Sequence, residues 1–134
     1  MVVDTSVIVH IYLKESGWQQ TLNLLEQQER RLCSVASIIE AQAVIAGRTE
    51  EVDPFTLLDS IVLELNIEVA PLTLRQSKLA RAAYLKYGKG QGHKAQLNYG
   101  DVMSYALAKD TAERLAFVGD DFQHTDLKVL QLPL

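Results

Sequence analysis

The chain divides into short apolar runs and longer segments in which apolar residues recur every three or four positions. The short runs are typical of buried strands, and they lie at residues 1–3, 32–34, 67–70, 115–118 and 128–130. The longer segments are typical of amphipathic helices, and they lie at residues 5–13, 17–30, 35–46, 53–65, 73–87 and 98–110. Because strands and helices alternate, the pattern predicts an α/β fold with a parallel sheet covered by helices on both faces.

Length, cysteine content and charge narrow the class of protein. The 134 residues fit one domain, spanning 1–134. Cys33 is the only cysteine, which excludes an internal disulfide and leads us to expect a cytoplasmic protein. No apolar run is long enough to cross a membrane. The net charge of −4 counts against a nucleic-acid-binding protein, unless bound cations neutralise several of the acids.

Four acids fall where the predicted strands end or the following helices begin. Asp4 follows the first strand directly, and Asp120 comes two residues after the strand at 115–118. Asp101 lies in the first turn of its predicted helix, and Glu40 in the second turn of the helix at 35–46. The carboxyl ends of parallel strands share one edge of a sheet. We therefore expect the four carboxylates to converge if the first, second and fourth strands are neighbours.

Three of these acids also have a structural interpretation. Asp4 is a favoured residue for capping the first helix. Asp101 follows Asn98 by three residues, so the pair resembles a capping box. Asp120 and Asp121 follow Gly119, which is typical of a plain turn.

Glu40 is harder to explain structurally, because its neighbours on the same helical face are small or apolar residues: Ala36, Ser37, Ala43 and Val44. Burial without a partner would raise the pKa of this carboxyl group or cost several kcal/mol. A cation is the simplest partner, with an arginine or lysine as the alternative. Clustered carboxylates without a cysteine or histidine set favour Mg²⁺ or Mn²⁺, and such ions serve phosphoryl transfer.

A series of fragments extends these observations over nearly the whole chain. They are Val3-Asp4-Thr5-Ser6, Ser34 and Ser37 before Glu40, Tyr87-Gly88-Lys89-Gly90, Leu97-Asn98-Tyr99-Gly100-Asp101, Tyr105-Ala106-Leu107-Ala108, Gly119-Asp120-Asp121-Phe122 and Thr125-Asp126. In this order and spacing, the fragments resemble those of PIN-domain nucleases. The resemblance is closest to the VapC-type ribonuclease toxins of toxin–antitoxin pairs.

The resemblance implies a catalytic and metal-binding quartet of Asp4, Glu40, Asp101 and Asp120, holding Mg²⁺ or Mn²⁺. Asp121 would be an accessory acid, and Thr5, Ser6 and Asn98 would shape the pocket. The implied fold is a three-layer α/β/α sandwich, a single PIN domain over 1–134, with strand order 3-2-1-4-5. The implied activity is hydrolysis of RNA phosphodiester bonds by the toxin of a toxin–antitoxin pair. The implied partners are RNA, a cognate antitoxin and a second copy in a homodimer, with the helices at 17–30 and 53–65 as docking candidates.

The glycine-rich stretch at 88–92 lacks the ending of a phosphate-binding P-loop and follows a helix. It is either a solvated connector or a basic loop that contacts the RNA backbone through Lys86, Lys89, His93 and Lys94.

Two other classes of function compete with a nuclease. A metal-dependent phosphatase or receiver-like α/β domain would require a lysine after the strand at 115–118, where the sequence has Gly-Asp-Asp. A non-catalytic module that only binds RNA or a protein would be expected to lack part of the acidic quartet, and all four acids are present.

Overall fold

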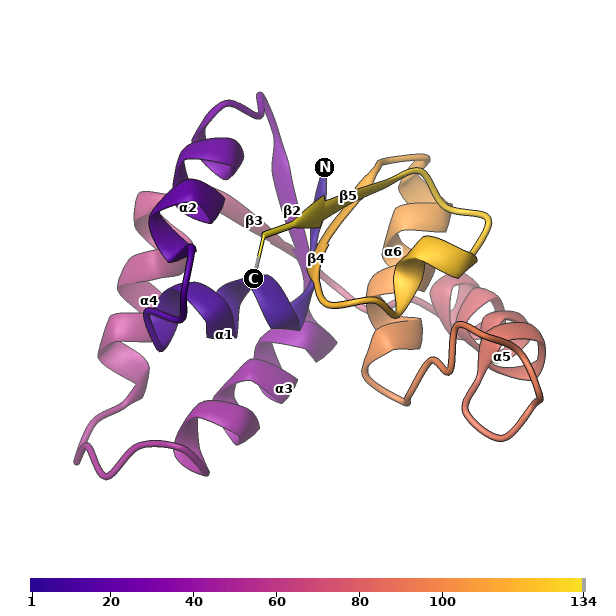
Figure 1. The fold of residues 1–134 in the computed structure, drawn as a ribbon, viewed down its shortest axis with the longest axis horizontal. Coiled ribbons are helices and arrows are strands. Elements are labelled where there is room, and N and C mark those ends of the chain that lie inside the picture. Colours follow the sequence, from indigo (N-terminus) through magenta and orange to yellow (C-terminus); the bar gives the residue numbers. More distant parts are fainter. Residues whose placement is uncertain (134) are drawn as a thin grey trace.

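The protein, described here by a computed structural model over residues 1–133, is a five-stranded parallel sheet between two layers of helices (Figure 1). The strands are β1 (Val2–Val3), β2 (Arg31–Ser34), β3 (Ile67–Ala70), β4 (Leu115–Val118) and β5 (Val129–Leu132). Their order across the sheet is β3-β2-β1-β4-β5, and all four neighbouring pairs are parallel. The predicted fold class and strand order are confirmed.

The helices divide between the two faces of the sheet (Figure 1). One face carries α1 (Thr5–Tyr12), α2 (Trp18–Glu26), α3 (Val35–Ala46) and α4 (Phe55–Glu64). The other face carries α5 (Leu74–Tyr87) and α6 (Asp101–Thr111). A short 3₁₀ helix, η1 (Phe122–His124), connects β4 to β5. No helix within residues 1–133 has the length and apolar character needed to cross a membrane.

Alternation along the strands gives the sheet two cores. Val3 and Ala116 pack with α1 to α4, whereas Val2 and Leu115 pack with α5 and α6. Successive side chains of a strand point to opposite faces, so strands buried on both faces are apolar throughout. This explains why β1 and β4 appear in the sequence as continuous apolar runs.

Two helices begin directly where a strand ends. Asp4 follows β1 and accepts a hydrogen bond from the Ser6 amide at 3.0 Å, which caps α1. Ser34 ends β2 and accepts one from the Ala36 amide at 3.2 Å, which caps α3. With no intervening loop, the first turns of both helices lie at the carboxyl edge of the sheet.

Two predicted helix boundaries differ from the structure by three residues or more. The helix predicted at 17–30 ends at Glu26, because the chain must turn into β2. The side chain of Arg31 donates to the carbonyl oxygens of Leu25 and Gln28 at 2.8 and 2.7 Å, so carbonyl groups in and just after the last turn of the helix are satisfied. The helix predicted from Asn98 begins at Asp101, since Asn98 serves as a cap outside the helix.

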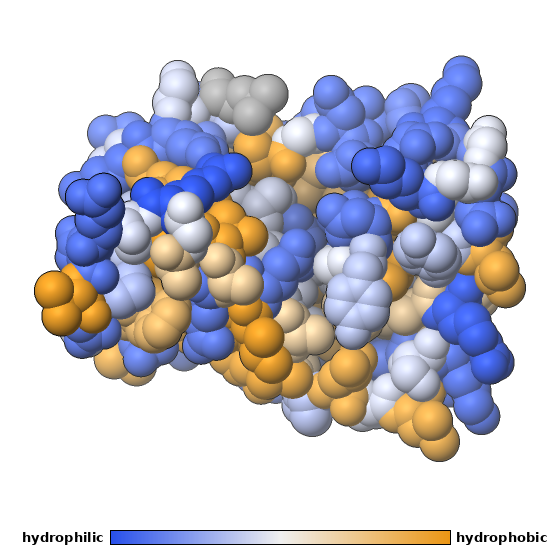
Figure 2. Space-filling view, turned by 90° about the horizontal axis from the view of Figure 1, so that it is seen from below, coloured by the Kyte–Doolittle hydropathy of each residue, from blue (hydrophilic) through white to orange (hydrophobic). Residues whose placement is uncertain are grey.

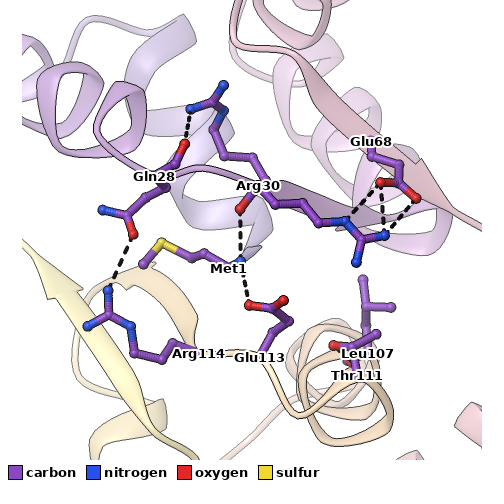
Figure 3. Close-up of polar contacts among 9 residues, drawn as sticks. Met1, Gln28, Arg30, Glu68, Leu107, Thr111, Glu113 and Arg114 are labelled. Atoms are coloured by element: carbon purple, nitrogen blue, oxygen red, sulfur yellow. Dashed lines mark hydrogen bonds and ion pairs between the residues drawn. The ribbon is translucent and has the colours of Figure 1, made fainter.

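Charged groups at the amino edge of the sheet are paired (Figure 3). The α-amino group of Met1 donates to the Arg30 carbonyl oxygen at 2.9 Å and to the Glu113 carboxylate at 2.7 Å. The Arg30 guanidinium binds both carboxylate oxygens of Glu68 at 3.0–3.1 Å. These contacts join β1, β2 and β3 to the segment after α6.

Candidate active site

A cavity of about 290 Å³ opens at the carboxyl edge of the sheet, on the side from which Figure 2 views the molecule. Five acids line it. Glu15 pairs with Arg48, and the other four, Asp4, Glu40, Asp101 and Asp121, come from four different segments. The remaining lining residues are Thr5, Ser6, Val9, Val44, Arg48, Asn98 and Val118. Three of the four acids predicted to converge therefore do so, and all three predicted pocket-shaping residues line the same cavity.

Asp4 is 4% exposed and is held by hydroxyl groups on both of its oxygens. Oδ2 accepts hydrogen bonds from the amide and the hydroxyl of Ser6, at 3.0 and 2.7 Å. Oδ1 accepts one from the buried hydroxyl of Ser104 in α6, at 2.6 Å. The Ser6 hydroxyl in turn accepts from the Val118 amide at 3.0 Å, which ties α1 to the end of β4. The capping role of Asp4 and its place in the cavity are thus compatible.

Glu40 reaches the cavity from α3 and is half-buried. The Thr5 hydroxyl donates to its Oε2 at 2.9 Å. Burial raises the pKa of this carboxyl group and the negative charge of Asp4 raises it further, while the Thr5 hydrogen bond opposes the shift. Glu40, which has small or apolar neighbours on its helical face, therefore lies in a partly buried site beside other acids.

Asp101 combines a capping box with a position in the cavity. Its backbone amide donates to Asn98 Oδ1 at 2.9 Å, and its Oδ2 accepts from the Asn98 amide at 2.8 Å. The side chain is almost fully buried, and this burial raises the pKa of Asp101 to about 7. Charges on Asp4, Asp121 and Glu40 add to the increase, whereas the Asn98 amide opposes it. These shifts indicate that the four carboxylates interact electrostatically.

Asp120 and Asp121 occupy different surroundings. Asp121 lines the cavity, and burial followed by the charges of Asp4 and Asp120 raises its pKa. Both residues retain solvent exposure, and Asp120 Oδ1 accepts hydrogen bonds from the side-chain amides of Gln131 at 3.0 Å and Gln123 at 3.4 Å. The structure therefore places Asp121 among the other acids and Asp120 outside the cavity lining. Gly119, with a φ of 115°, forms the turn that decides which of the two adjacent acids faces inward.

Within residues 1–133, no cation forms an ion pair with any of the four cavity acids. Arg48 lines the cavity, but it pairs with Glu15 at 3.4 Å. A set of carboxylate oxygens with no paired cation has the chemistry that Mg²⁺ and Mn²⁺ prefer. As the side chains stand, no three His, Cys, Asp or Glu residues in this part of the chain are arranged to hold a metal ion. The donor set thus fits a hard divalent cation in kind and charge, while oxygens of Asp4, Glu40 and Asp101 accept hydrogen bonds from hydroxyl and amide donors.

Ser104, which supports Asp4 from outside the cavity lining, and Arg48, which lines the cavity, were not identified from the sequence. Ser104 bonds to Asp4 and lies 3.0 Å from the hydroxyl of Ser37, so one buried chain of hydroxyl groups connects α6 with α3. Its position one turn after Asp101 places it on the same helical face, which is the signal that would have revealed it. Arg48 follows Gly47 at the end of α3, and no spacing in the sequence links it to the acids.

The four residues proposed to contact RNA from the glycine-rich loop lie outside the cavity lining. Lys86 Nζ lies 5.0 Å from the centre of the Tyr87 ring, and His93 packs edge-on against the same ring at 4.9 Å. The Nδ1 atom of His93 also accepts a hydrogen bond from the Ala95 amide at 3.1 Å. His93 therefore has a structural role within the loop that connects α5 to α6.

Comparison with known proteins decides the family. The model of the PIN domain family matches residues 1–128. The chain belongs to the PIN domain family. Ribonuclease VapC42 of Mycobacterium tuberculosis is 41% identical over 128 residues, which cover 96% of this chain and 97% of that protein. Ribonuclease VapC30 of the same organism is 40% identical over 133 residues, which cover 99% of this chain and all of that protein.

Solved structures of this family share the fold at low sequence identity. The M. tuberculosis toxin VapC20, described as cleaving the sarcin–ricin loop, superposes with a TM-score of 0.77 at 14% identity, over 97% of this chain and 98% of that one. A chain of the DNA-bound VapBC2 complex from Rickettsia felis superposes with a TM-score of 0.76 at 13% identity, over 98% of both chains. The PIN-domain architecture is therefore retained where most residues differ.

Proposed function

We propose that this PIN-domain protein is a ribonuclease that hydrolyses RNA phosphodiester bonds and acts as the toxin of a VapC-type toxin–antitoxin pair. The observation that carries the proposal is the set of unpaired carboxylates around one cavity, in a chain that aligns over nearly its full length with VapC ribonucleases. A non-catalytic binding module would have no use for buried acids held together against their mutual repulsion. We also propose that residues 1–134 form one PIN domain, and that it acts in the cytoplasm, where its substrate would be found.

The proposed cofactor is Mg²⁺ or Mn²⁺, held by Asp4, Glu40, Asp101 and Asp121. Asp120, the acid that the family resemblance favoured for this set, would be the accessory acid beside them. When bound, such an ion lowers the pKa of a water molecule and stabilises negative charge on the attacked phosphate. Without a bound cation, the acids would repel the RNA backbone, so the proposal requires metal-dependent activity.

The chain's own residues would hold the acids and orient the substrate. Ser6 and Ser104 fix both oxygens of Asp4, and Thr5 fixes one oxygen of Glu40. Arg48 is more than half exposed and lines the cavity, so its guanidinium is placed to bind an RNA phosphate entering beside the acids. Contacts from Lys86, Lys89, His93 and Lys94 would lie farther along the RNA, because none of them lines the cavity.

A groove of about 180 Å³ between α1, α2 and α4 is the proposed docking site for the antitoxin. Trp18 and Leu22 line it from α2, and Leu57 and Ile61 line it from α4. These are the two helices expected from the sequence to dock a partner. Several chains of the same fold come from toxin–antitoxin complexes, among them one from Klebsiella pneumoniae with a TM-score of 0.69. An apolar peptide or helix would fill the groove, with Lys14 and Glu64 at its margin.

A homodimer is also proposed, using the apolar surface around the start of α6. Side chains exposed there include Ile39 at 60%, Leu85 at 66% and Tyr99 at 77%. Figure 2 shows hydrophobic side chains gathered below the centre of this side of the molecule. Exposed apolar area of this kind is typical of an interface between subunits. Light scattering on the purified protein tests the dimer, and a monomer at micromolar concentration would contradict it.

The activity is tested with purified protein and total cellular RNA. We expect defined cleavage fragments in Mn²⁺ or Mg²⁺ and none in EDTA. Asp4→Asn, which retains the shape of the side chain, serves as the inactive control. Cleavage that persists in EDTA or in the Asp4→Asn variant would contradict the proposal, as would intact RNA under every metal condition.

A further inference from the structure

Gly100 lies against the carboxylate of Glu40, although the two residues come from different helices. A Cβ atom added to Gly100 would lie 2.1 Å from Oε2 of Glu40 and 2.3 Å from both Oε1 and Cδ. All three distances are far shorter than any van der Waals contact. The whole carboxylate group of Glu40 therefore packs on the Cα of Gly100, in space that any other side chain would fill.

The same carboxylate is also held by a hydroxyl group. Thr5 Oγ1 donates to Oε2 of Glu40 at 2.9 Å, and Thr5 is itself buried where α1 begins. The Glu40 carboxylate thus contacts both Thr5 and Gly100, next to the residue that starts α6. The position of its carboxylate depends on both contacts.

The backbone of Gly100 does not require glycine. Its φ of −68° and ψ of −42° are ordinary helical values that any residue adopts. Glycine at a helical position is also less favourable than alanine, because it loses more conformational freedom on folding. What Gly100 supplies is therefore space for Glu40, and not a special turn.

We propose that Gly100 is a positioning residue, which keeps the Glu40 carboxylate beside Asp101 by offering no side chain there. The proposal rests on the proposed function, in which Glu40 helps to hold the cation. A side chain at position 100 would displace the flexible end of Glu40 and leave the fold intact. The site would then lose one of its ligands without any loss of stability.

The test compares Gly100→Ala with a matched control, Gly47→Ala. Gly47 follows α3, and a Cβ atom there would meet only backbone oxygens at 3.6 Å, an ordinary contact. We expect Gly100→Ala to unfold at the same temperature as wild type in EDTA, or higher. We expect it to bind Mn²⁺ at least tenfold more weakly by calorimetric titration and to cleave RNA at least tenfold more slowly. Gly47→Ala should bind Mn²⁺ and cleave RNA like wild type.

A second substitution tests whether Gly100 acts through Glu40. Glu40→Asp shortens the side chain by one methylene, which withdraws the carboxylate from position 100. Alone, it should weaken Mn²⁺ binding, because the carboxylate reaches less far. The double variant Gly100→Ala/Glu40→Asp should bind Mn²⁺ at least threefold more tightly than Gly100→Ala alone. Losses that simply add in the double variant would overturn the proposal, as would wild-type Mn²⁺ affinity in Gly100→Ala.

Crystal structures of wild type and Gly100→Ala separate this proposal from the proposed function. The Glu40 carboxylate should leave its place between Thr5 and position 100 in the variant, whether or not the protein binds metal or cleaves RNA. An unmoved carboxylate would overturn the positioning role. A wild-type protein that neither binds Mn²⁺ nor cleaves RNA would contradict the proposed function instead.

Discussion

Acidic side chains have different surroundings at the two edges of the central sheet. At the amino edge, Glu113 and Glu68 each have a cationic partner within 3.0 Å (Figure 3). At the carboxyl edge, Asp4 and Asp101 are more deeply buried than either of those glutamates, yet within residues 1–133 neither forms an ion pair. Burying an acid without a counter-charge costs free energy, which burial with a partner largely offsets.

The difference shows which edge is shaped by stability and which by chemistry. Hydroxyl and amide groups at the carboxyl edge hold the acids in place without neutralising them. An arginine or lysine inserted there would relieve the repulsion, but it would also occupy the place of a cation. The unpaired acids lower the stability of the fold, and they are retained because the site needs their charge to bind a cation.

Removing a cavity acid should have the largest effect on activity. Asp4→Asn keeps the size of the side chain and removes its charge, so we expect RNA cleavage to fall on the order of 10²- to 10³-fold, as for loss of one electrostatic group in an active site. Glu113→Gln removes an acid at the opposite edge and should leave the rate of cleavage unchanged. Equal losses in both variants would mean that the acids act through stability alone.

Divalent metal should stabilise the wild-type protein by mass action. At a Mn²⁺ concentration of 100 times Kd, the free energy of unfolding should rise by about 2.7 kcal/mol. Asp101→Asn should lose most of this response, which thermal unfolding with Mn²⁺ and with EDTA measures. A wild-type unfolding temperature that Mn²⁺ does not change would argue against a cation site at this edge.

The free energy of unfolding should depend on pH through the titration of Asp101. Its pKa is raised from 3.8 to about 7 in the folded protein, so the protonated carboxyl group is favoured by folding. Its stabilising contribution is fully present below about pH 4 and is lost as the pH rises through about 7.

In EDTA, the unfolding free energy of wild type should therefore fall between pH 4 and pH 8, by on the order of 2–4 kcal/mol from this group. Asp101→Asn should lack that part of the fall and be the more stable protein at pH 8. Parallel pH profiles for the two proteins, from chemical denaturation, would show that Asp101 is not under electrostatic strain.

Ser104→Ala should have a moderate effect. It removes the buried 2.6 Å hydrogen bond to Asp4, which should lower the free energy of unfolding by about 1.5–3 kcal/mol, the usual range for a hydrogen bond to a charged group. Cleavage should fall less than in Asp4→Asn. Ser77→Ala is the control, because within residues 1–133 its exposed hydroxyl bonds only to the Leu74 carbonyl of α5.

The smallest effect is expected at the paired edge. Arg30→Ala breaks the ion pair with Glu68, in which both side chains are 57% exposed. Exposed pairs contribute only about 0–1 kcal/mol, so the unfolding free energy should change by less than about 1 kcal/mol. A larger loss would show that the pair is part of the packing between β2 and β3.

The sequence was sufficient to predict most of the fold, since the periods of the apolar pattern and the strand-to-helix junctions are local. Asp4 and Asp101 could be placed at the carboxyl edge because each is next to the end of a strand or the start of a helix. Their capping roles, considered as alternatives, are also present in the structure. Capping and a place in the site are both consequences of lying at that edge.

What the sequence did not reveal depends on geometry that has no local pattern. Asp120 and Asp121 are adjacent, and only the turn at Gly119 decides which one faces the cavity. The contact between Gly100 and Glu40 joins residues far apart in the chain, so no spacing indicates it. Arg48 follows the end of α3, and it lines the cavity because of the direction in which that helix carries the chain.

The most direct test of the unpaired acidic edge is a calorimetric titration of Mn²⁺ into the wild-type protein and Asp101→Asn at pH 7.5. We predict saturable binding to wild type and binding at least tenfold weaker to the variant. If wild type binds no Mn²⁺, or if both proteins bind it equally, the carboxylates at this edge are not a cation site and the nuclease mechanism proposed here is wrong.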